Sequence, residues 1–183
     1  MKRKTAKDLL ADSFRELAEK KSVDKITVRE IAEGCGYSPA TFYRQFRDKY
    51  DLIAWDYSRS ISEIMDRIGQ GYPWPQTLLD AANFFQEQRD YLANLFLHTS
   101  GHDSFVRYME EINYQSLRGS ILRVMGREEL DEGMSMLVRV YCLGTVNLTC
   151  EWILGAYHAT AQELAKVYEH ALPEPLQPYL HET

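Results

Sequence analysis

The chain has 183 residues, of which 45% are hydrophobic and 12% aromatic, so it can form the core of one large or two small domains. The three cysteines lack the spacing of a metal site and no apolar leader opens the chain, which predicts reduced thiols and a cytoplasmic location. The net charge of −6 is uneven, because residues 1–50 hold 12 Lys and Arg against 8 Asp and Glu. A basic head on an acidic body favours contact of the head with a polyanion, although any lysine-rich N-terminus has the same appearance.

The first predicted helix spans residues 5–20, where apolar side chains recur at helical spacing. Lys2, Arg3, Lys4 and Lys7 lie in and before its first turn, the end at which the helix dipole is already positive. A bound phosphate would compensate these charges, and a solvated tail would need no compensation. Both interpretations stay open at this point.

A second, short helix and a tight turn are predicted after a polar connection. Thr27 has the position of an N-cap, and Glu30 that of its capping-box partner. The apolar stripe of this helix consists of Val28, Ile31, Ala32 and Cys35. A glycine of the segment Gly34–Gly36 can adopt the left-handed conformation of the turn. Ser38 followed by Pro39 is a strong start for the next helix.

The helix from Pro39 to about Phe46 has two different faces. At about 100° per residue, Phe42 and Phe46 point inward and Tyr43 falls on the border. The outward face consists of Ala40, Thr41, Arg44 and Arg47. Arginine can form two hydrogen bonds with guanine, and alanine and threonine methyl groups can contact a thymine methyl. These features predict a helix-turn-helix whose second helix enters a major groove, rather than an ordinary surface helix.

A long helix is expected next. Asp48 is its predicted N-cap, with Asp51 as the acid of a capping box. Lys49 would place an ammonium beside free backbone amides, where it could hold a phosphate. The apolar stripe continues to about Ile68, and Gly69–Gly71 would end the helix.

The stretch ITVREIAEGCGYSPATFYRQFRDKYDLI resembles the DNA-binding domain of the TetR/AcrR regulators. The shared pattern is a Thr before the second helix, IA within it, G-Y/V-S at the turn, T-F/L-Y-x-x-F in the recognition helix and then K-x-x-L. The resemblance implies phosphate contacts by Thr27, Tyr43 and Lys49, and base contacts by Ala40, Thr41 and Arg44, beside Ser38 and Pro39 at the helix start. The segments DKYDLIAWDY, FFQEQRDYLANLF and SGHDSF further resemble a branch that includes regulators of dihydroxyacetone kinase operons.

Two domains are predicted, a DNA-binding head over residues 1–50 and a body over residues 51–183. Helical apolar spacing recurs through the body and no strand-type alternation is present, so the expected fold class is all-α. The expected body helices span residues 76–89, 91–98 with Asp90 as cap, about 104–125, 133–156 and 160–171. Pro173, Pro175 and Pro178 are expected to end helical structure.

The segment 133–156 is apolar almost all round, which predicts a helix that is buried on every side. Arg139, Asn147 and Glu151 interrupt it, so it is not expected to span a membrane, which needs roughly 20 apolar residues in a row. The amphipathic segment 160–172 follows. Such a pair suits a two-plus-two helix bundle across a dimer axis, and the resemblance implies the same homodimer interface.

No phosphate-binding loop, nucleophile elbow or Cys–His signature occurs in the sequence, so we expect no enzyme and no cofactor. His98 and His102 are a helical turn apart, but Gly101 separates them and no further ligand completes a metal site. Aromatic residues of the body could line an effector pocket, although aromatics at helical spacing more often pack a core. The candidate pocket residues are Trp55, Phe84, Phe85, Phe96, His98, Tyr108, Tyr114, Arg118, Tyr141, Asn147 and Trp152.

The predicted function is a cytoplasmic, homodimeric regulator that binds a pseudo-palindromic operator in double-stranded DNA and responds to a small-molecule effector. No membrane partner is expected. The resemblance favours repression and leaves activation open. One alternative is a helical small-molecule binder or enzyme that retains the head as a relic. The other is a regulator that acts only through a partner protein.

Overall fold

The computed structural model describes residues 4–68, 70–101 and 104–181, and these residues form helices and no strand, which confirms the all-α class. The α-helices are α1 (Ala6–Ala18), α2 (Val28–Gly34), α3 (Pro39–Gln45), α4 (Lys49–Met65), α5 (Trp74–Glu87), α6 (Arg89–His98), α7 (Phe105–Met125), α8 (Glu132–Ile153), α9 (Ala161–His170) and α10 (Pro178–His181). The 3-10 turns within the described residues are η1 (Val23–Lys25) and η3 (Glu174–Leu176). The predictions made for Lys2, Arg3, Gly69 and His102 lie outside the described residues.

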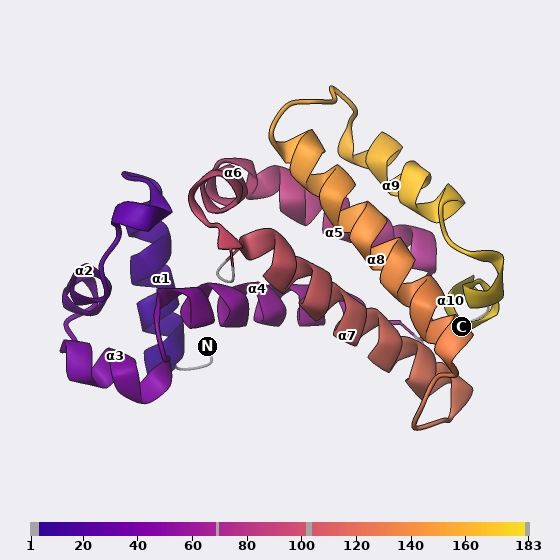
Figure 1. Cartoon of the computed structure of the whole chain (residues 1–183), viewed down its shortest axis with the longest axis horizontal. Coiled ribbons are helices and arrows are strands. Elements are labelled where there is room, and N and C mark those ends of the chain that lie inside the picture. Colours follow the sequence, from indigo (N-terminus) through magenta and orange to yellow (C-terminus); the bar gives the residue numbers. More distant parts are fainter. Residues whose placement is uncertain (1–3, 69, 102–103, 182–183) are drawn as a thin grey trace.

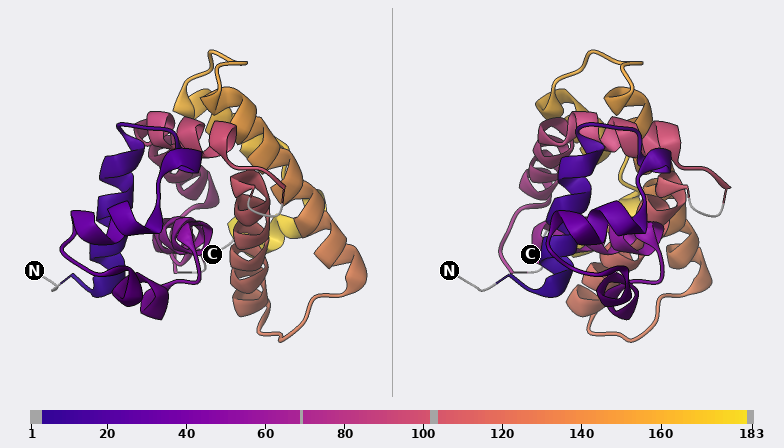
Figure 2. Two further views of the ribbon diagram at one scale, coloured as in Figure 1. Left: turned by 60° about the vertical axis from the view of Figure 1, so that its left-hand side comes forward. Right: turned by 90° about the vertical axis from the view of Figure 1, so that its left-hand side faces the viewer.

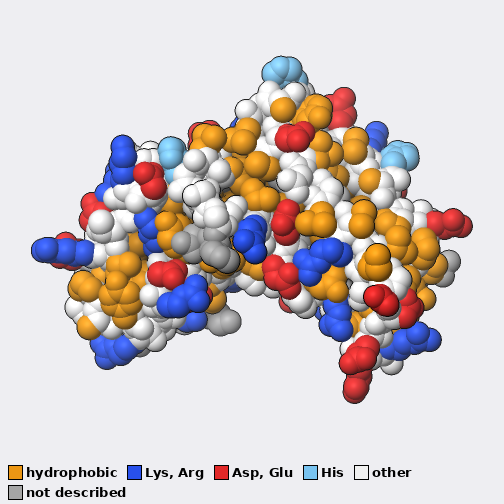
Figure 3. Space-filling view, in the orientation of Figure 1, with side chains coloured by type: hydrophobic (Ala, Val, Ile, Leu, Met, Phe, Trp, Pro, Cys, Tyr) orange, Lys and Arg blue, Asp and Glu red, His pale blue; other side chains and the backbone are white. Residues whose placement is uncertain are grey.

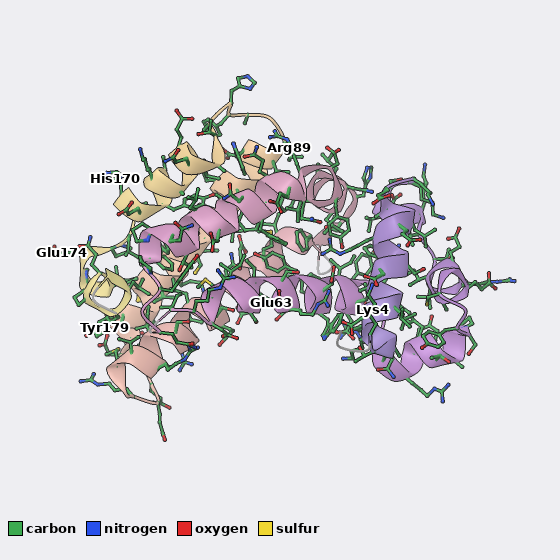
Figure 4. All side chains as sticks on the ribbon, turned by 180° about the vertical axis from the view of Figure 1, so that it is seen from behind. Lys4, Glu63, Arg89, His170, Glu174 and Tyr179 are labelled. Atoms are coloured by element: carbon green, nitrogen blue, oxygen red, sulfur yellow. The ribbon has the colours of Figure 1, made fainter. Side chains whose placement is uncertain are left out.

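The helices form a head and a body that α4 joins (Figure 1). The helices α1, α2 and α3 lie at one end of the molecule, and Figure 2 shows this head from its own side. In the body, α7 packs against both α4 and α8, and α5 packs against α9. Seen from behind, Lys4 lies on the head and Glu63 on the stretch of α4 that belongs to the body (Figure 4). The predicted domain boundary at residue 50 falls in the first turn of α4, so this helix is part of both units.

The second helix begins as the sequence predicts. The Thr27 hydroxyl accepts a hydrogen bond from the Glu30 amide at 3.3 Å, and the Glu30 carboxylate accepts one from the Thr27 amide at 2.9 Å. The nearby Lys21 ammonium, together with these Thr27 donors, lowers the pKa of Glu30 to about 2. The start of α2 therefore stays fixed over the whole physiological pH range.

The turn between α2 and α3 depends on Gly36, whose φ of 76° is left-handed. The Tyr37 amide donates to the Ala32 carbonyl at 2.8 Å and the Gly36 amide donates to the Glu33 carbonyl at 3.1 Å. This pair of bonds is a Schellman motif, which satisfies the last carbonyls of α2. Ser38 directly follows Tyr37 and is the N-cap of α3.

An aromatic contact anchors α3 in the head, and α1 and α2 approach each other closely. Phe42 and Phe46 are buried as predicted, and their ring centroids lie 5.8 Å apart. Across the head, the buried Ser13 hydroxyl donates to the Ile31 carbonyl at 2.8 Å. A Cβ at Gly34 would collide with the Ser13 hydroxyl, so glycine is needed there for α1 and α2 to approach.

Three local predictions were wrong. Asp51 accepts a hydrogen bond from the Arg47 amide, not from the amide of Asp48, so the predicted capping box does not close. Asp90 lies inside α6, whose N-cap is Gln88, because α6 begins directly after α5. Pro175 and Pro178 lie at the beginnings of η3 and α10, since a proline has no amide hydrogen to lose in a first turn.

The prediction that residues 133–156 are buried on every side was also wrong for the single chain. Met136, Val140 and Leu143 on α8 are 62%, 65% and 39% exposed. They follow one another at four- and three-residue spacing, so they form one continuous stripe. None of the helices within the described residues is long and apolar enough to cross a membrane.

Candidate nucleic-acid interface and ligand cavity

The outward face of α3 is presented to solvent by a well-defined helix start. The Ser38 hydroxyl accepts a hydrogen bond from the Thr41 amide at 3.3 Å, and Pro39 occupies the first turn. Thr41 is half-buried. The exposed predicted DNA contacts on this helix are Ser38, Pro39, Ala40, Tyr43 and Arg44. The structure thus gathers them on one surface, and their contact with DNA stays a prediction.

The two arginines of this face differ in their partners. The Arg44 guanidinium donates only one hydrogen bond within the described structure, to the neutral Thr41 hydroxyl at 3.0 Å. The Arg47 guanidinium lies 2.9 Å from the Asp48 carboxylate. A neutral hydroxyl is a weaker partner than a carboxylate, so Arg44 can exchange its bond for a base edge at lower cost. Arg44 is therefore the less strongly held of the two arginines, and its contact with a base stays a prediction.

Thr27 and Lys49, the predicted phosphate contacts outside α3, already have partners inside the head. The Thr27 hydroxyl donates to the Glu30 carboxylate at 2.8 Å. The Lys49 ammonium donates to the carbonyls of Val23, Asp24 and Ile26 at 2.8, 3.0 and 2.9 Å. Lys49 therefore fastens the start of α4 to η1.

The surroundings predicted for Lys49 were wrong in one respect. The first amides of α4 are not free, because the Asp48 carboxylate accepts hydrogen bonds from the Tyr50 and Asp51 amides. Partial burial lowers the pKa of the Lys49 ammonium, and the nearby Asp24 opposes that effect. The phosphate contact of Lys49 stays a prediction beside this structural role.

Replacing Lys49 with methionine is expected to lower the free energy of unfolding by about 1–3 kcal/mol, because three carbonyls lose a charged donor. Urea denaturation measures this loss, and Lys25→Met, which changes an exposed lysine of η1, is the control.

Band-shift titrations over a range of salt concentrations test the predicted phosphate contact of Lys49. A slope that falls by about 1 would support a phosphate contact, and an unchanged slope would restrict Lys49 to structure.

The helices of the body line a partly open cavity of about 60 Å³. Its walls come from α4, α5, α7, α8 and α9, and they include Phe85 and Tyr141, two of the predicted pocket residues. The other nine predicted residues do not line it: Trp55, Phe84, Phe96, His98, Tyr108, Tyr114, Arg118, Asn147 and Trp152.

Several of these nine side chains have packing partners elsewhere. Trp55 packs on Phe46 in the head, with ring centroids 5.6 Å apart. Trp152 donates its indole N–H to the Ala159 carbonyl at 2.7 Å. Their positions follow from helix packing, which the spacing of aromatics in the sequence does not determine.

Two known protein families match the chain. The head matches "Bacterial regulatory proteins, tetR family" over residues 11–54. The body matches "Transcriptional regulator C-terminal region" of the TetR type over residues 73–172, more than half of the chain. The protein belongs to the TetR family. It is therefore a transcriptional regulator with a helix-turn-helix head, and the predicted family is confirmed.

Individual TetR relatives are distant in sequence. The dhaKLM operon transcriptional activator DhaS of Lactococcus lactis is 21% identical over 89 residues, which are 49% of this chain and 48% of DhaS. The chain thus spans about half the length of this curated relative. A solved structure of the dihydroxyacetone kinase operon activator DhaS is 17% identical, with a TM-score of 0.66 over 95% of this chain and 97% of that one.

Two solved TetR-family repressors have a similar fold. The repressor AlkX from Dietzia sp. has a TM-score of 0.61 at 19% identity, over 99% of this chain and 100% of its own. The repressor FadR of Thermus thermophilus, solved with lauroyl-CoA, has a TM-score of 0.60 at 16% identity, over 91% of this chain and 92% of its own. These low identities show a shared fold only.

The TetR head is joined to the body by a polar network that the sequence analysis missed. The Asp56 carboxylate on α4 is fully buried and accepts hydrogen bonds from Arg15 at 2.7 Å and from Arg59 at 3.2 Å. Arg15 also donates to the Gln88 side chain at 2.6 Å and stacks over the Tyr91 ring. One arginine of α1 therefore contacts α4 and the junction of α5 with α6.

A second tie between head and body is Asn94 on α6. Its amide nitrogen donates to the carbonyls of Ala18 and Lys21 at 2.8 and 3.0 Å, and its oxygen accepts from the Val23 amide at 3.0 Å. The His98 ring lies 3.5 Å from the Asp24 carboxylate beside it. A shift of α6 would thus act directly on the end of α1 and on η1. Among the described residues no cluster of His, Cys, Asp and Glu has the arrangement of a metal site.

Proposed function

We propose that this TetR-family protein is a homodimeric regulator that binds a pseudo-palindromic operator in the cytoplasm. Two copies of α3 would enter successive major grooves, with centres about 34–36 Å apart or a multiple of that distance. The observation that carries this proposal is the exposed face of α3, on which Arg44 is held, among the described residues, only by the Thr41 hydroxyl. An exposed arginine on such a face suits base edges.

The proposed dimer interface is formed by α8 and α9. Met136, Val140 and Leu143 make an exposed apolar stripe on α8, and Val167 on α9 is 50% exposed. Val140 and Val167 line one hollow of about 330 Å³ between these helices. Hydrophobic side chains gather along α8, on the diagonal from the top centre to the right of Figure 3. A contiguous apolar surface of this kind favours a protein partner, and a second copy of the same pair of helices would complete a bundle.

The proposed effector site is the cavity between the body helices. Phe85 lines this cavity, and Gln88, three residues further on, is bonded to Arg15 of the head. Movement of α5 and α6 on effector binding would change the tilt of α1 and the spacing of the two α3 helices. We favour repression. DhaS is named as an activator and AlkX as a repressor. Reporter transcription with and without the gene therefore measures whether this protein represses or activates.

Arg44→Ala is expected to relax sequence preference at one position of each half-site. The expected loss on the preferred operator is about 1–3 kcal/mol per recognised base, with little change on unrelated DNA. Band-shift titrations on both kinds of DNA measure the difference. The control is Arg107→Ala, an exposed arginine of α7 in the body. Equal losses on all DNA would refute base recognition by Arg44.

Binding of the purified protein to its own upstream DNA distinguishes this proposal from its alternatives. Affinity in the nanomolar range at physiological salt is expected of a specific regulator. Binding that needs an added partner protein would favour the second alternative. Turnover of a small molecule with no DNA affinity would favour an enzyme or binder that keeps the head as a relic.

A further inference from the structure

The cavity in the body is electrically neutral. Its lining contains no Asp, Glu, Lys, Arg or His. Burial raises the pKa of the Cys142 thiol to about 12, and it also raises the pKa of the Tyr141 and Tyr168 phenols. A charged ligand would lose its water here without gaining a counter-charge, which is strongly unfavourable. The lining therefore excludes carboxylates, phosphates and amines.

The hydroxyl groups of the lining are already paired with one another and with the backbone. The Tyr141 hydroxyl donates to the Tyr168 carbonyl at 2.9 Å, and Thr145 donates to the Tyr141 carbonyl at 2.9 Å. The Thr149 and Tyr168 hydroxyls lie 2.6 Å apart, and both face the Thr145 carbonyl. This side of the cavity thus has few polar groups left for a ligand.

The lining also holds a donor without a partner among the described residues. Trp74, the first residue of α5, lines the cavity and is 2% exposed. Its indole nitrogen is buried and has no hydrogen-bond partner among the described residues. Nearby, the Asn113 oxygen accepts from the Tyr57 hydroxyl at 2.8 Å, which leaves the Asn113 amide N–H₂ as a second donor. A buried donor without a partner is costly, so an acceptor brought by a ligand would be bound favourably.

The size of the cavity limits the ligand to few atoms. Its volume is about 60 Å³, whereas an apolar protein cavity of about 150 Å³ holds benzene. A molecule of about four or five non-hydrogen atoms therefore fits after small movements of the lining side chains. The Trp74 N–H has almost no accessible surface, so an acceptor would reach it only when neighbouring side chains of the lining move.

We propose that the effector is a small, uncharged and mainly apolar molecule with a carbonyl-type acceptor, such as a ketone, aldehyde or ester, and that Trp74 donates its indole N–H to that acceptor. The inference rests on the proposed effector function of the cavity. Trp74 begins α5 and Phe85 lies near its end, so a ligand bound at Trp74 displaces the helix that leads to Gln88 and the head.

The test uses the full chain and probes of similar size, each with about five or six non-hydrogen atoms. Butan-2-one carries the acceptor, 2-methylbut-1-ene has the same shape with a methylene in place of the oxygen, and butyrate and butylammonium carry charge. Ligand-observed NMR measures the affinities, and thermal shift gives a second readout. Butan-2-one is expected to bind about tenfold more tightly than its methylene analogue, because only the ketone accepts a buried hydrogen bond. The two ions are expected not to bind.

Two variants test the donor. Trp74→Phe keeps an aromatic ring without the N–H and is expected to abolish the tenfold preference for the ketone. Trp55→Phe, which changes a tryptophan packed in the head, is expected to keep it. If butyrate bound as tightly as butan-2-one, the ligand would not have to be uncharged, and this part of the proposal would be wrong. If ketone and alkene bound equally well to the unaltered chain, the proposed hydrogen bond to an acceptor would be wrong. If Trp74→Phe does not fold, the comparison of ketone and alkene in the unaltered chain still tests whether the site binds an acceptor.

Band shifts on the same preparations measure DNA binding, so the ligand class and the DNA-binding function are tested separately. Intact operator binding without ketone binding would reject the ligand class and keep the regulator. Ketone binding without any DNA affinity would keep the site and reject the regulator.

Discussion

Replacing Asp56 with alanine is expected to lower the free energy of unfolding by about 3 kcal/mol. Its carboxylate is fully buried on α4 and is bonded to Arg15 of α1 and to Arg59. Removal of one partner leaves guanidinium groups at a buried junction without their counter-charge, which costs about 3–5 kcal/mol for a fully buried pair. The Arg15 side chain is 27% exposed, and the water that reaches it places the estimate at the lower end of that range.

The matched control is Asp12→Ala. Asp12 pairs with Lys4, and their side chains are 39% and 64% exposed, so its removal is expected to change stability by about 0.5 kcal/mol or less. Urea denaturation followed by circular dichroism measures both variants. A loss below about 1 kcal/mol for Asp56→Ala would mean that the network contributes little to folding.

The same network connects the head to the helices that line the proposed effector cavity. Arg15 contacts Gln88 at the junction of α5 and α6, and Asn94 on α6 holds the end of α1 and η1. Arg89, labelled at the same junction in Figure 4, donates to the Trp152 carbonyl at 2.9 Å and so connects α6 to α8. A change in α5 or α8 thus reaches the head through hydrogen bonds that define the position of α6. This is why a variant of Asp56 is expected to alter operator affinity as well as stability.

The head was predictable because its determinants are local. The N-caps Thr27 and Ser38, the left-handed Gly36 and the inward Phe42 and Phe46 each act within a few residues of chain. Their structures follow from short-range hydrogen bonds and helical spacing. The contacts of Lys49 were not predictable in the same way, because its carbonyl partners lie more than 20 residues earlier in the chain.

The cavity was less predictable, since five helices must be placed before its lining is known. Phe85 and Tyr141 were identified, whereas Trp74, the hydroxyl cluster and Asn113 were not. Asp56 did leave a signal in the sequence. It lies four residues after Leu52 and three after Ile53, inside the apolar stripe of α4, and a charged residue there must be paired when buried.

The largest difference between predicted and observed burial is in α8. The sequence predicts a helix that is buried on every side, and the chain leaves Met136, Val140 and Leu143 exposed. One chain cannot bury this stripe with its own helices, so the surplus favours a partner surface of the same kind. The proposed symmetric dimer would supply it, because each copy would present the same stripe to the other.

Val140→Asp is expected to convert the proposed dimer to a monomer. Val140 is the centre of the stripe and is 65% exposed in the single chain. In a two-fold interface each copy would bury one unpaired carboxylate, and the two negative charges would lie near each other. Burial of an unpaired charge costs several kcal/mol, so the dissociation constant of the dimer is expected to rise by at least about a hundredfold, since 1.4 kcal/mol is a factor of ten.

Sedimentation velocity measures the oligomeric state, and band shifts measure the consequence for DNA. A monomer holds one half-site alone, so operator affinity is expected to fall together with dimerisation while the head stays folded. The control is Leu97→Asp on α6, because Leu97 is 64% exposed but lies outside α8 and α9. A Val140→Asp protein that remains a dimer would place the interface on another surface. Monomers from Leu97→Asp but not from Val140→Asp would place that surface on α6, next to Asn94 and the head, and would make dimerisation itself part of the control of α3.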